Sequence, residues 1–258
     1  MQKVNIFKIS LTAVTFFITL LLVLAIGSLF VVPSLEDIRQ NIWNAEMRYS
    51  LKLSLVTGLI STILVMLFAL PVGYALSRFH FWGKGFVKTI IDMPIAFPEL
   101  VLGLCLLLLF GNTPVGKLLS ALGLTFVFTK KGIVAAQFFT ALPYAIRIMK
   151  STFDYINPRI EFVSRSLGYS MAETFKNISL PLAKNGILAS TVISFARCIG
   201  TFGTVLILAG GSYMKTEILP ITLYLNISYG NMGMALTSGI VLMVVSFIAI
   251  FIFEKTEV

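Results

Sequence analysis

Few residues in this chain have the types and spacing that chemistry requires. The run GNTPVGK at residues 111–117 matches GxxxxGK, the start of a phosphate-binding loop. However, Leu118 follows where such a loop needs Ser or Thr for magnesium, and no alternating strand and helix pattern surrounds it. The sequence therefore predicts no nucleotide site in this chain.

Metal, thiol and nucleophilic chemistry are not indicated either. The single histidine, His80, lies in a short basic stretch without neighbouring ligands. Cys105 and Cys198 each sit in an apolar run, where a thiol usually behaves as a small buried hydrophobe. Since no HExxH or GxSxG motif occurs, we expect no cofactor, no metal and no catalytic residue.

Three charged residues interrupt apolar runs. Arg197 lies in the middle of one run, and Asp92 and Glu99 lie near Pro94 and Pro98 in another. A charge among apolar residues normally faces a water-filled path or a partner group. Arg197 is therefore expected either to line such a path or to pair with Asp92 or Glu99. The two prolines predict an irregular, hydrated helix around these carboxylates.

The elements that position these residues are membrane helices. Of the 258 residues, 57% are hydrophobic and only 12% are charged, which is too apolar for a soluble domain. Apolar runs approach the roughly 20 residues that a spanning helix needs. They predict an all-α integral membrane protein, a single transmembrane domain over residues 1–258, with six spans at 11–33, 51–77, 89–110, 132–151, 183–210 and 232–253.

Local details refine these spans. The first span follows Lys3 and Lys8 like a secretion signal, but its apolar run is too long for one, so we expect it to be retained. Pro71 and Pro143 are expected to interrupt the second and fourth spans. Small residues four apart, including Gly73, predict close helix packing.

The net charge of +9 is distributed unevenly across the membrane. With six spans, most Lys and Arg residues fall in loops on the side of the two termini. The positive-inside rule therefore predicts a multi-pass protein, in contact with membrane lipid, with both termini in the cytoplasm. No basic patch lies outside the membrane segments, so nucleic-acid binding is not expected.

A polar segment at residues 157–181 separates the fourth and fifth spans, on the predicted cytoplasmic side. Asn157 is a good N-cap and Pro158 suits the first position of a helix to residue 167, which Gly168 ends in a left-handed conformation. Ser170 and Glu173 form a capping box for a second helix. Each helix is expected to have one apolar face. In the first helix this face holds Ile160, Val163 and Leu167, and in the second it holds Ala172, Phe175 and Ile178.

Leu180 and Pro181 are expected to stop the second helix and lead into the fifth span. Two interpretations of the whole segment follow from its residues. It is either an amphipathic connector at the level of the lipid headgroups or a docking element for a soluble partner.

The segment also carries a resemblance. In this segment, Gly168 is followed after nine residues by ISLP at 178–181. This pattern is similar to a signature in the membrane subunits of ABC importers, in which EAAxxxG is followed after nine residues by IxLP. The EAA positions are here Phe162, Val163 and Ser164, directly after Glu161. The resemblance implies that this loop, residues 157–181, is a coupling helix that inserts into a cleft of a cytoplasmic ATPase. The implied ATPase-coupling residues are Glu161, Arg165, Gly168, Ile178, Leu180 and Pro181.

Two further segments, residues 81–111 and 194–210, resemble the molybdate, tungstate and sulfate permeases. That family commonly has ARxxGEFG where this chain has ARCIGTFG at 196–203, so Thr201 replaces the usual acid. The implied pore or gate residues are Arg197, Gly200, Thr201 and Gly203. Asp92 and Glu99 would repel an anion, so they are not expected to bind one directly.

The resemblance implies the type I ABC importer permease fold, with its core at residues 50–253, and a non-enzymatic role. The chain would form the path for a tetrahedral oxyanion, molybdate or tungstate first and sulfate next, in a prokaryotic plasma membrane. Implied partners are two copies of an ABC ATPase, a second permease copy and an extracytoplasmic binding protein, which would contact residues 34–50 and 111–131. Two alternatives stay open: an ATP-independent secondary transporter or channel, and a membrane enzyme with an intramembrane active site.

Overall fold

The computed structural model describes residues 6–31 and 33–256 of the chain. Residues 1–5 and 257–258, the two termini whose side of the membrane is predicted, lie outside the described residues, as does residue 32 in the first predicted span. Within the described residues the chain forms helices, turns and bends but no strand, which confirms the all-α prediction.

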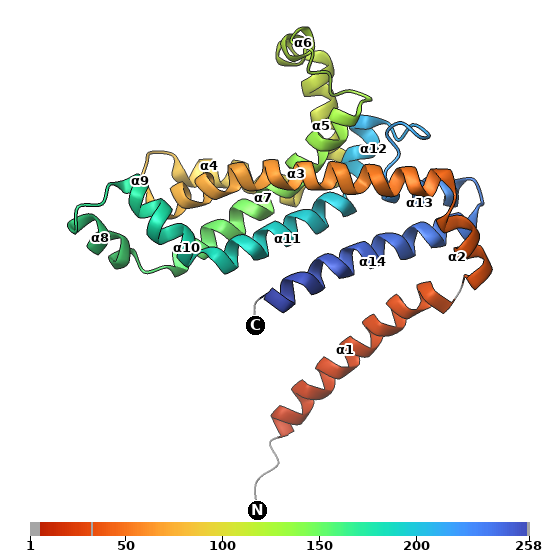
Figure 1. The fold of residues 1–258 in the computed structure, drawn as a ribbon, viewed down its shortest axis with the longest axis horizontal. Helices are drawn as coiled ribbons and strands as arrows, with labels where there is room; N and C mark the ends of the chain where they lie inside the picture. Colours follow the sequence, from red (N-terminus) through yellow and green to blue (C-terminus); the bar gives the residue numbers. More distant parts are fainter. Residues whose placement is uncertain (1–5, 32, 257–258) are drawn as a thin grey trace, which may run out of the picture.

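The helices follow one another with short connections (Figure 1). They are α1 (Ile6–Val31), α2 (Leu35–Ile42), α3 (Ala45–Arg78), α4 (Lys84–Ala96), α5 (Glu99–Asn112), α6 (Pro114–Ala121), α7 (Lys130–Tyr155), α8 (Pro158–Ser166), α9 (Met171–Thr174), the π-helix η1 (Phe175–Ser179), α10 (Leu180–Leu182), α11 (Lys184–Gly200), α12 (Gly203–Ala209), α13 (Leu219–Ser228) and α14 (Met232–Thr256).

Among the described residues, four helices are long and apolar enough to cross a membrane by themselves: α1, α3, α7 and α14. The regions of the other two predicted spans, 89–110 and 183–210, contain bent helix pairs, although the second pair begins in the polar segment at Met171 and ends at Gly200. Helices α4 and α5 meet at an angle of 116°, and the helical segment Met171–Leu182 meets α11 at 73°. Counting each bent pair as one span gives six, in agreement with the six predicted apolar runs.

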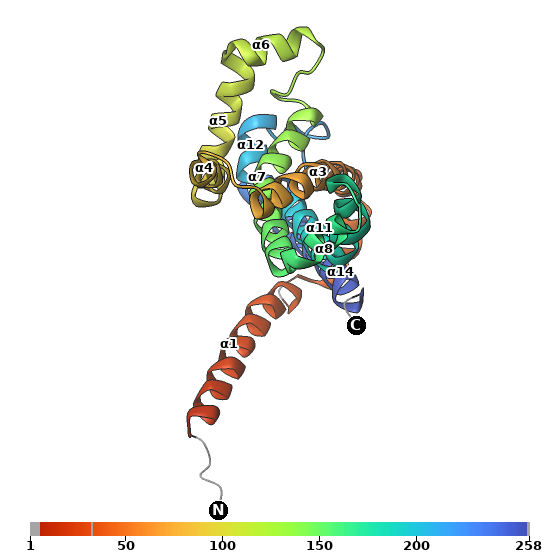
Figure 2. The same cartoon turned by 90° about the vertical axis from the view of Figure 1, so that its left-hand side faces the viewer.

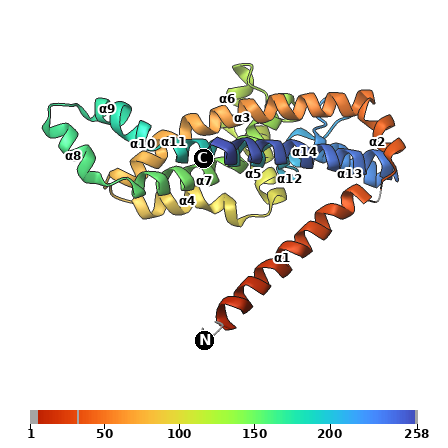
Figure 3. The same cartoon turned by 60° about the horizontal axis from the view of Figure 1, so that its bottom comes forward.

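The centre of the molecule is a bundle in which α3, α7, α11 and α14 lie side by side (Figures 1 and 3). Pro71 and Pro143 end neither helix, because α3 and α7 run through them as continuous helices. Gly73 packs so closely on α7 that an added Cβ would lie 2.6 Å from the Cβ of Met149. The predicted close packing through small residues is therefore confirmed at this crossing.

Two parts of the chain leave the bundle. Helix α1 points away from it, and no residue of its apolar window is buried, so its apolar side chains require lipid or another chain (Figure 2). Helices α5 and α6 project in a different direction after the break at Phe97 and Pro98. This break is the irregularity that the prolines around Asp92 and Glu99 predicted.

Candidate functional site

The polar segment forms a hairpin of α8 and α9 at one end of the bundle (Figure 1). Its predicted helix signals are confirmed. The side chain of Asn157 accepts a hydrogen bond from the Arg159 N–H at 3.0 Å, and Gly168 has a φ of +98°. Ser170 and Glu173 form the capping box, and hydrogen bonds from Ser170 lower the pKa of the Glu173 carboxyl.

Glu161 is the centre of the contacts that attach this hairpin to the bundle. The Arg78 Nε–H, at the end of α3, donates to both carboxylate oxygens of Glu161 at 3.0 Å. Ser179 Oγ donates to the same carboxylate at 2.8 Å, and the Tyr74 hydroxyl donates at 3.3 Å. Glu161 thus joins α8 to the end of α3 and, through Ser179, to the beginning of the bent span that contains α11.

The apolar residues of α8 do not face the bundle as an ordinary amphipathic helix would. Ile160, Val163 and Leu167 are exposed, and the buried residues of α8 are Glu161 and Ser164. The predicted apolar stripe exists, but it faces outward because the buried charge of Glu161 requires Arg78 as its partner. The hairpin therefore presents apolar side chains to its surroundings.

The second helix of the hairpin continues beyond the predicted stop. After α9 the chain passes through the π-helix η1 and then α10, so LP at 180–181 does not end the helix, and the bend follows at Ala183. Pro181 lies in the first turn of α10, directly after the π-helix η1, so the chain stays helical through this proline. Phe175 is half-buried against the Tyr74 ring, at 4.6 Å between centroids, as its predicted position on the apolar side required.

Some of the remaining predicted coupling residues lie near this network. Arg165 lines a pocket with Arg78 and Glu161. Ile178 and Leu180 are half-buried on either side of Ser179, whereas Pro181 is exposed. Arg165 therefore lies near Glu161, and Ile178 and Leu180 flank the Ser179 that donates to it. Gly168 lies farther away, at the tip between α8 and α9, and Pro181 lies in α10 after the hairpin.

The predicted gate residues lie at a break in the fifth span. Helix α11 ends at Gly200, Thr201 and Phe202 are not helical, and α12 begins at Gly203. Thr201 is almost fully buried, and its hydroxyl donates to the Arg197 carbonyl at 2.7 Å. Thr201 therefore satisfies a local backbone group at the position where the resembling family has an acid.

The predicted pairing of Arg197 with Asp92 or Glu99 is wrong. Arg197 forms no ion pair among the described residues, and its guanidinium lies 4.1 Å from the centre of the Tyr144 ring. Asp92 instead lies 3.6 Å from Arg147. Arg197 is exposed, so a cation held on an aromatic ring remains available to an anion.

Glu99 has a different partner that the sequence did not reveal. Its carboxylate accepts hydrogen bonds from the backbone N–H groups of Phe202 and Gly203, at 3.1 and 2.9 Å. A negative side chain at the start of a helix balances its free N–H groups and its dipole. Glu99 of α5 thereby fastens the α4–α5 break to the break between α11 and α12.

The structure also excludes the phosphate-binding loop. Residues 111–117 lie at the end of α5 and the start of α6, with Thr113 as the N-cap of α6 and no strand before it. No cluster of three or more metal-ligating side chains occurs in the described part of the chain. The candidate site is therefore a mechanical one, made of the hairpin and the two helix breaks.

These features define a class: an all-helical membrane permease with a polar hairpin at one end of its bundle. The chain belongs to the family described as binding-protein-dependent transport system inner membrane component, whose model matches residues 69–255. This membership confirms a transport permease rather than an enzyme, and it does not support the alternative of an ATP-independent secondary transporter or channel.

Relatives with similar sequences are permeases as well. The molybdate/tungstate transport system permease protein of Methanocaldococcus jannaschii is 31% identical over 218 residues, covering 84% of each chain. The same permease of Pyrococcus abyssi is 36% identical over 181 residues, covering 70% of this chain and 67% of that one. The sulfate transport system permease protein CysT of Salmonella typhimurium is 26% identical, and the match covers 95% of this chain and 90% of that one.

Solved structures resemble the fold. A chain of a bacterial alginate ABC transporter has a TM-score of 0.75 at 16% identity, covering 96% of this chain and 92% of that one. A chain of the inward-facing MetNI methionine ABC transporter has a TM-score of 0.61 at 16% identity, and the match covers 83% of this chain and 97% of that one. These likenesses confirm the predicted type I importer permease fold.

Proposed function

We propose that this chain is the permease subunit of an ATP-driven importer and forms the path for a tetrahedral oxyanion, molybdate or tungstate first and sulfate next. Similarity to molybdate/tungstate permeases over most of the chain supports this order. The observation that carries the mechanism is the attachment of the hairpin to the bundle through the buried Glu161.

The hairpin has the physical properties of a coupling element. Its outward face carries Phe162 and Leu167, which are 71% and 77% exposed, so a soluble partner can bury them. We infer that this partner is a cytoplasmic ABC ATPase, present in two copies. Because Glu161 is bonded to both α3 and η1, a displacement of α8 passes to two spans instead of bending a loop.

The proposed path for the anion includes exposed cations. Arg197 and Arg147 lie on neighbouring helices, and Tyr144 contacts the first of them and lies one helical turn from the second. Cations along a polar path lower the cost of bringing a dianion into the membrane. Gly200, Thr201 and Gly203 form the adjacent helix break, where a small rotation would open or close the path.

The proposed topology places the hairpin and both termini in the cytoplasm of a prokaryotic cell. The hairpin lies at one end of the bundle, and α2 and α13 lie at the other (Figure 1). The end that carries α2, with residues 34–50, would meet the extracytoplasmic binding protein, and residues 111–131, on the arm formed by α5 and α6, would contribute a second contact. We propose a homodimer, because α1 and the Arg197 surface are both exposed in the single chain.

Reconstitution tests this function. The chain would be co-purified with its ATPase and binding protein and placed in proteoliposomes with radiolabelled molybdate, tungstate or sulfate. The account predicts uptake that requires ATP, with molybdate and tungstate competing better than sulfate. Uptake at the same rate without ATP would contradict it.

A further inference from the structure

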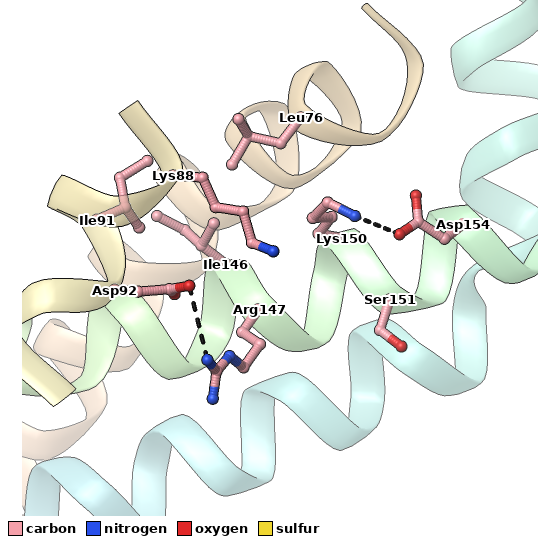
Figure 4. Close-up of a pocket in the computed structure, with 9 residues that line it drawn as sticks. All are labelled: Leu76, Lys88, Ile91, Asp92, Ile146, Arg147, Lys150, Ser151 and Asp154. Carbon is pink, nitrogen blue, oxygen red and sulfur yellow. Dashed lines mark hydrogen bonds and ion pairs between the residues drawn. The ribbon is translucent and has the colours of Figure 1, made fainter. Parts of the chain in front are cut away.

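A cavity between α4 and α7, at the hairpin end of the bundle, is not used by the coupling network. Its volume is about 150 Å³, and its wall includes Lys88 from α4 and Arg147 and Lys150 from α7 (Figure 4). At roughly 30 Å³ per water molecule, it has room for a small tetrahedral ion but not for a large organic ligand. Two carboxylates, Asp92 and Asp154, also line it.

The three cations are not equally neutralised. Lys150 forms an ion pair with Asp154 one turn along α7. Arg147 is only loosely paired, because its nearest nitrogen lies 3.6 Å from Asp92, beyond hydrogen-bond distance, and its side chain is 62% exposed. Lys88 has no ion pair or hydrogen bond among the described residues.

The arrangement of these groups suits an anion. Figure 4 shows the amino group of Lys88 directed into the space between the Asp92–Arg147 pair and Lys150. With Lys150 and Asp154 paired, Lys88 and the guanidinium of Arg147 keep N–H donors that have no hydrogen-bond acceptor in the described part of the chain. Several N–H donors from an ammonium and a guanidinium match the oxygens of a tetrahedral dianion.

We propose that Lys88 and Arg147, beside the Lys150–Asp154 ion pair, form a binding site for a tetrahedral oxyanion with up to two negative charges. The oxyanion has two possible sources: a free ion such as tungstate, or the phosphate headgroup of an anionic membrane lipid. A basic pocket between membrane helices near the bilayer surface suits the second source. The free-ion source rests on the proposed function, whereas the lipid source does not.

Two binding measurements on the purified full chain test this site without the ATPase or the binding protein. Equilibrium dialysis with radiolabelled tungstate, in nanodiscs of phosphatidylcholine, measures the free ion. Native mass spectrometry, after exposure to phosphatidylglycerol and cardiolipin, measures retained anionic lipid. Lys88→Gln is the main variant, since Lys88 is exposed and its replacement leaves no buried partner behind.

The matched control is Lys84→Gln, one turn earlier on α4, where the lysine donates to the Phe79 carbonyl and does not line the cavity. At least one ligand should bind the wild-type chain and bind about tenfold more weakly after Lys88→Gln, but not after Lys84→Gln. Arg147→Gln should have the same effect. The ligand that is lost identifies the source.

The proposal is overturned if neither tungstate nor anionic lipid binds, or if the Lys88 and Lys84 variants bind equally well. Either result leaves ATP-driven uptake untouched, so failure of this site is distinguishable from failure of the importer assignment. Conversely, absence of ATP-driven uptake together with lipid binding that depends on Lys88 would support the site and reject the importer.

Discussion

Arg78 and Glu161 form a buried ion pair that joins the end of α3 to the first helix of the hairpin, with side chains only 10% and 11% exposed. Arg78 also donates to the Ile156 carbonyl at 2.8 Å, so one guanidinium holds both α8 and the connection that leads into it. Because each partner is fixed on a helix, this pair gives the hairpin a defined position relative to the bundle.

Removal of Glu161 should both destabilise the protein and uncouple it. Glu161→Ala leaves Arg78 buried without its partner, which costs about 3 kcal/mol or more. We expect a lower melting temperature and a loss of ATP hydrolysis stimulated by the loaded binding protein. Glu173→Gln, on the exposed side of the same hairpin, is the control and should change stimulation little. Equal stimulation of both variants would contradict the role of Glu161.

Gly168 should be sensitive to a side chain for backbone reasons alone. Its φ is +98°, and an added Cβ would meet no atom within 4 Å, so a substitution creates strain without a clash. A side chain in this conformation costs about 1–2 kcal/mol. Gly168→Val should therefore reduce stimulated ATP hydrolysis by the reconstituted complex more than Gly168→Asn does, because Asn tolerates positive φ. Wild-type stimulation in the Val variant would reject the proposed function of the hairpin tip.

The apolar face of α8 should matter for association but not for folding. Phe162→Ser removes an exposed ring, so the melting temperature of the isolated permease should stay unchanged while less ATPase co-purifies. Tyr229→Ser, an exposed aromatic just after α13 at the other end of the bundle, serves as control. If both variants retain the ATPase equally, Phe162 does not contact it.

Arg197 should act on the transported anion. Arg197→Gln removes an exposed cation, and we expect ATP-dependent uptake of molybdate to fall about tenfold with little change in stability. Tyr144→Leu removes the ring beneath the guanidinium, an interaction of about 1 kcal/mol, so uptake should fall less. Uptake rates in proteoliposomes measure both effects, and a normal rate for Arg197→Gln would exclude this residue from the path.

Glu217, in the loop before α13, should make stability depend on pH. Burial and the neighbouring Glu46 raise the pKa of Glu217 from 4.5 to about 7. The folded protein therefore keeps this proton longer than the unfolded chain, and stability declines as the pH rises from about 4.5 to 7. Glu217→Gln should stabilise the protein more at pH 8 than at pH 5, by about 2 kcal/mol.

Melting curves at the two pH values measure this difference. Glu36→Gln, which changes an exposed acid of α2, should show no such dependence. An equal effect of Glu217→Gln at both pH values would mean that Glu217 keeps an ordinary pKa.

The sequence could predict the features of this protein that are local. Apolar run length identifies the spans, and the caps at Asn157, Gly168 and Ser170 depend only on neighbouring residues. Bend angles are not local in this sense. The 116° turn between α4 and α5 depends on what surrounds Pro98 as well as on the proline itself.

The contacts that organise the candidate site connect distant residues. Arg78 and Glu161 are 83 positions apart, and Glu99 meets the N–H of Gly203 across 104 positions. Arg78 is one of several basic residues near the ends of spans, and nothing in its neighbourhood distinguishes it from the others. From the sequence, Glu99 is a reasonable partner for Arg197 because the two residues carry opposite charges within apolar runs, but the free N–H groups at the start of α12 satisfy it instead.

Photo-crosslinking from the hairpin tests the central claim most directly. A benzoylphenylalanine in place of Phe162, in native membranes, should crosslink to a nucleotide-hydrolysing subunit, whereas the same probe at Tyr229 should not. Recovery of that subunit from Phe162 alone is the predicted result. If no ATPase is recovered from Phe162, the hairpin is not the part of this permease that a separate motor moves.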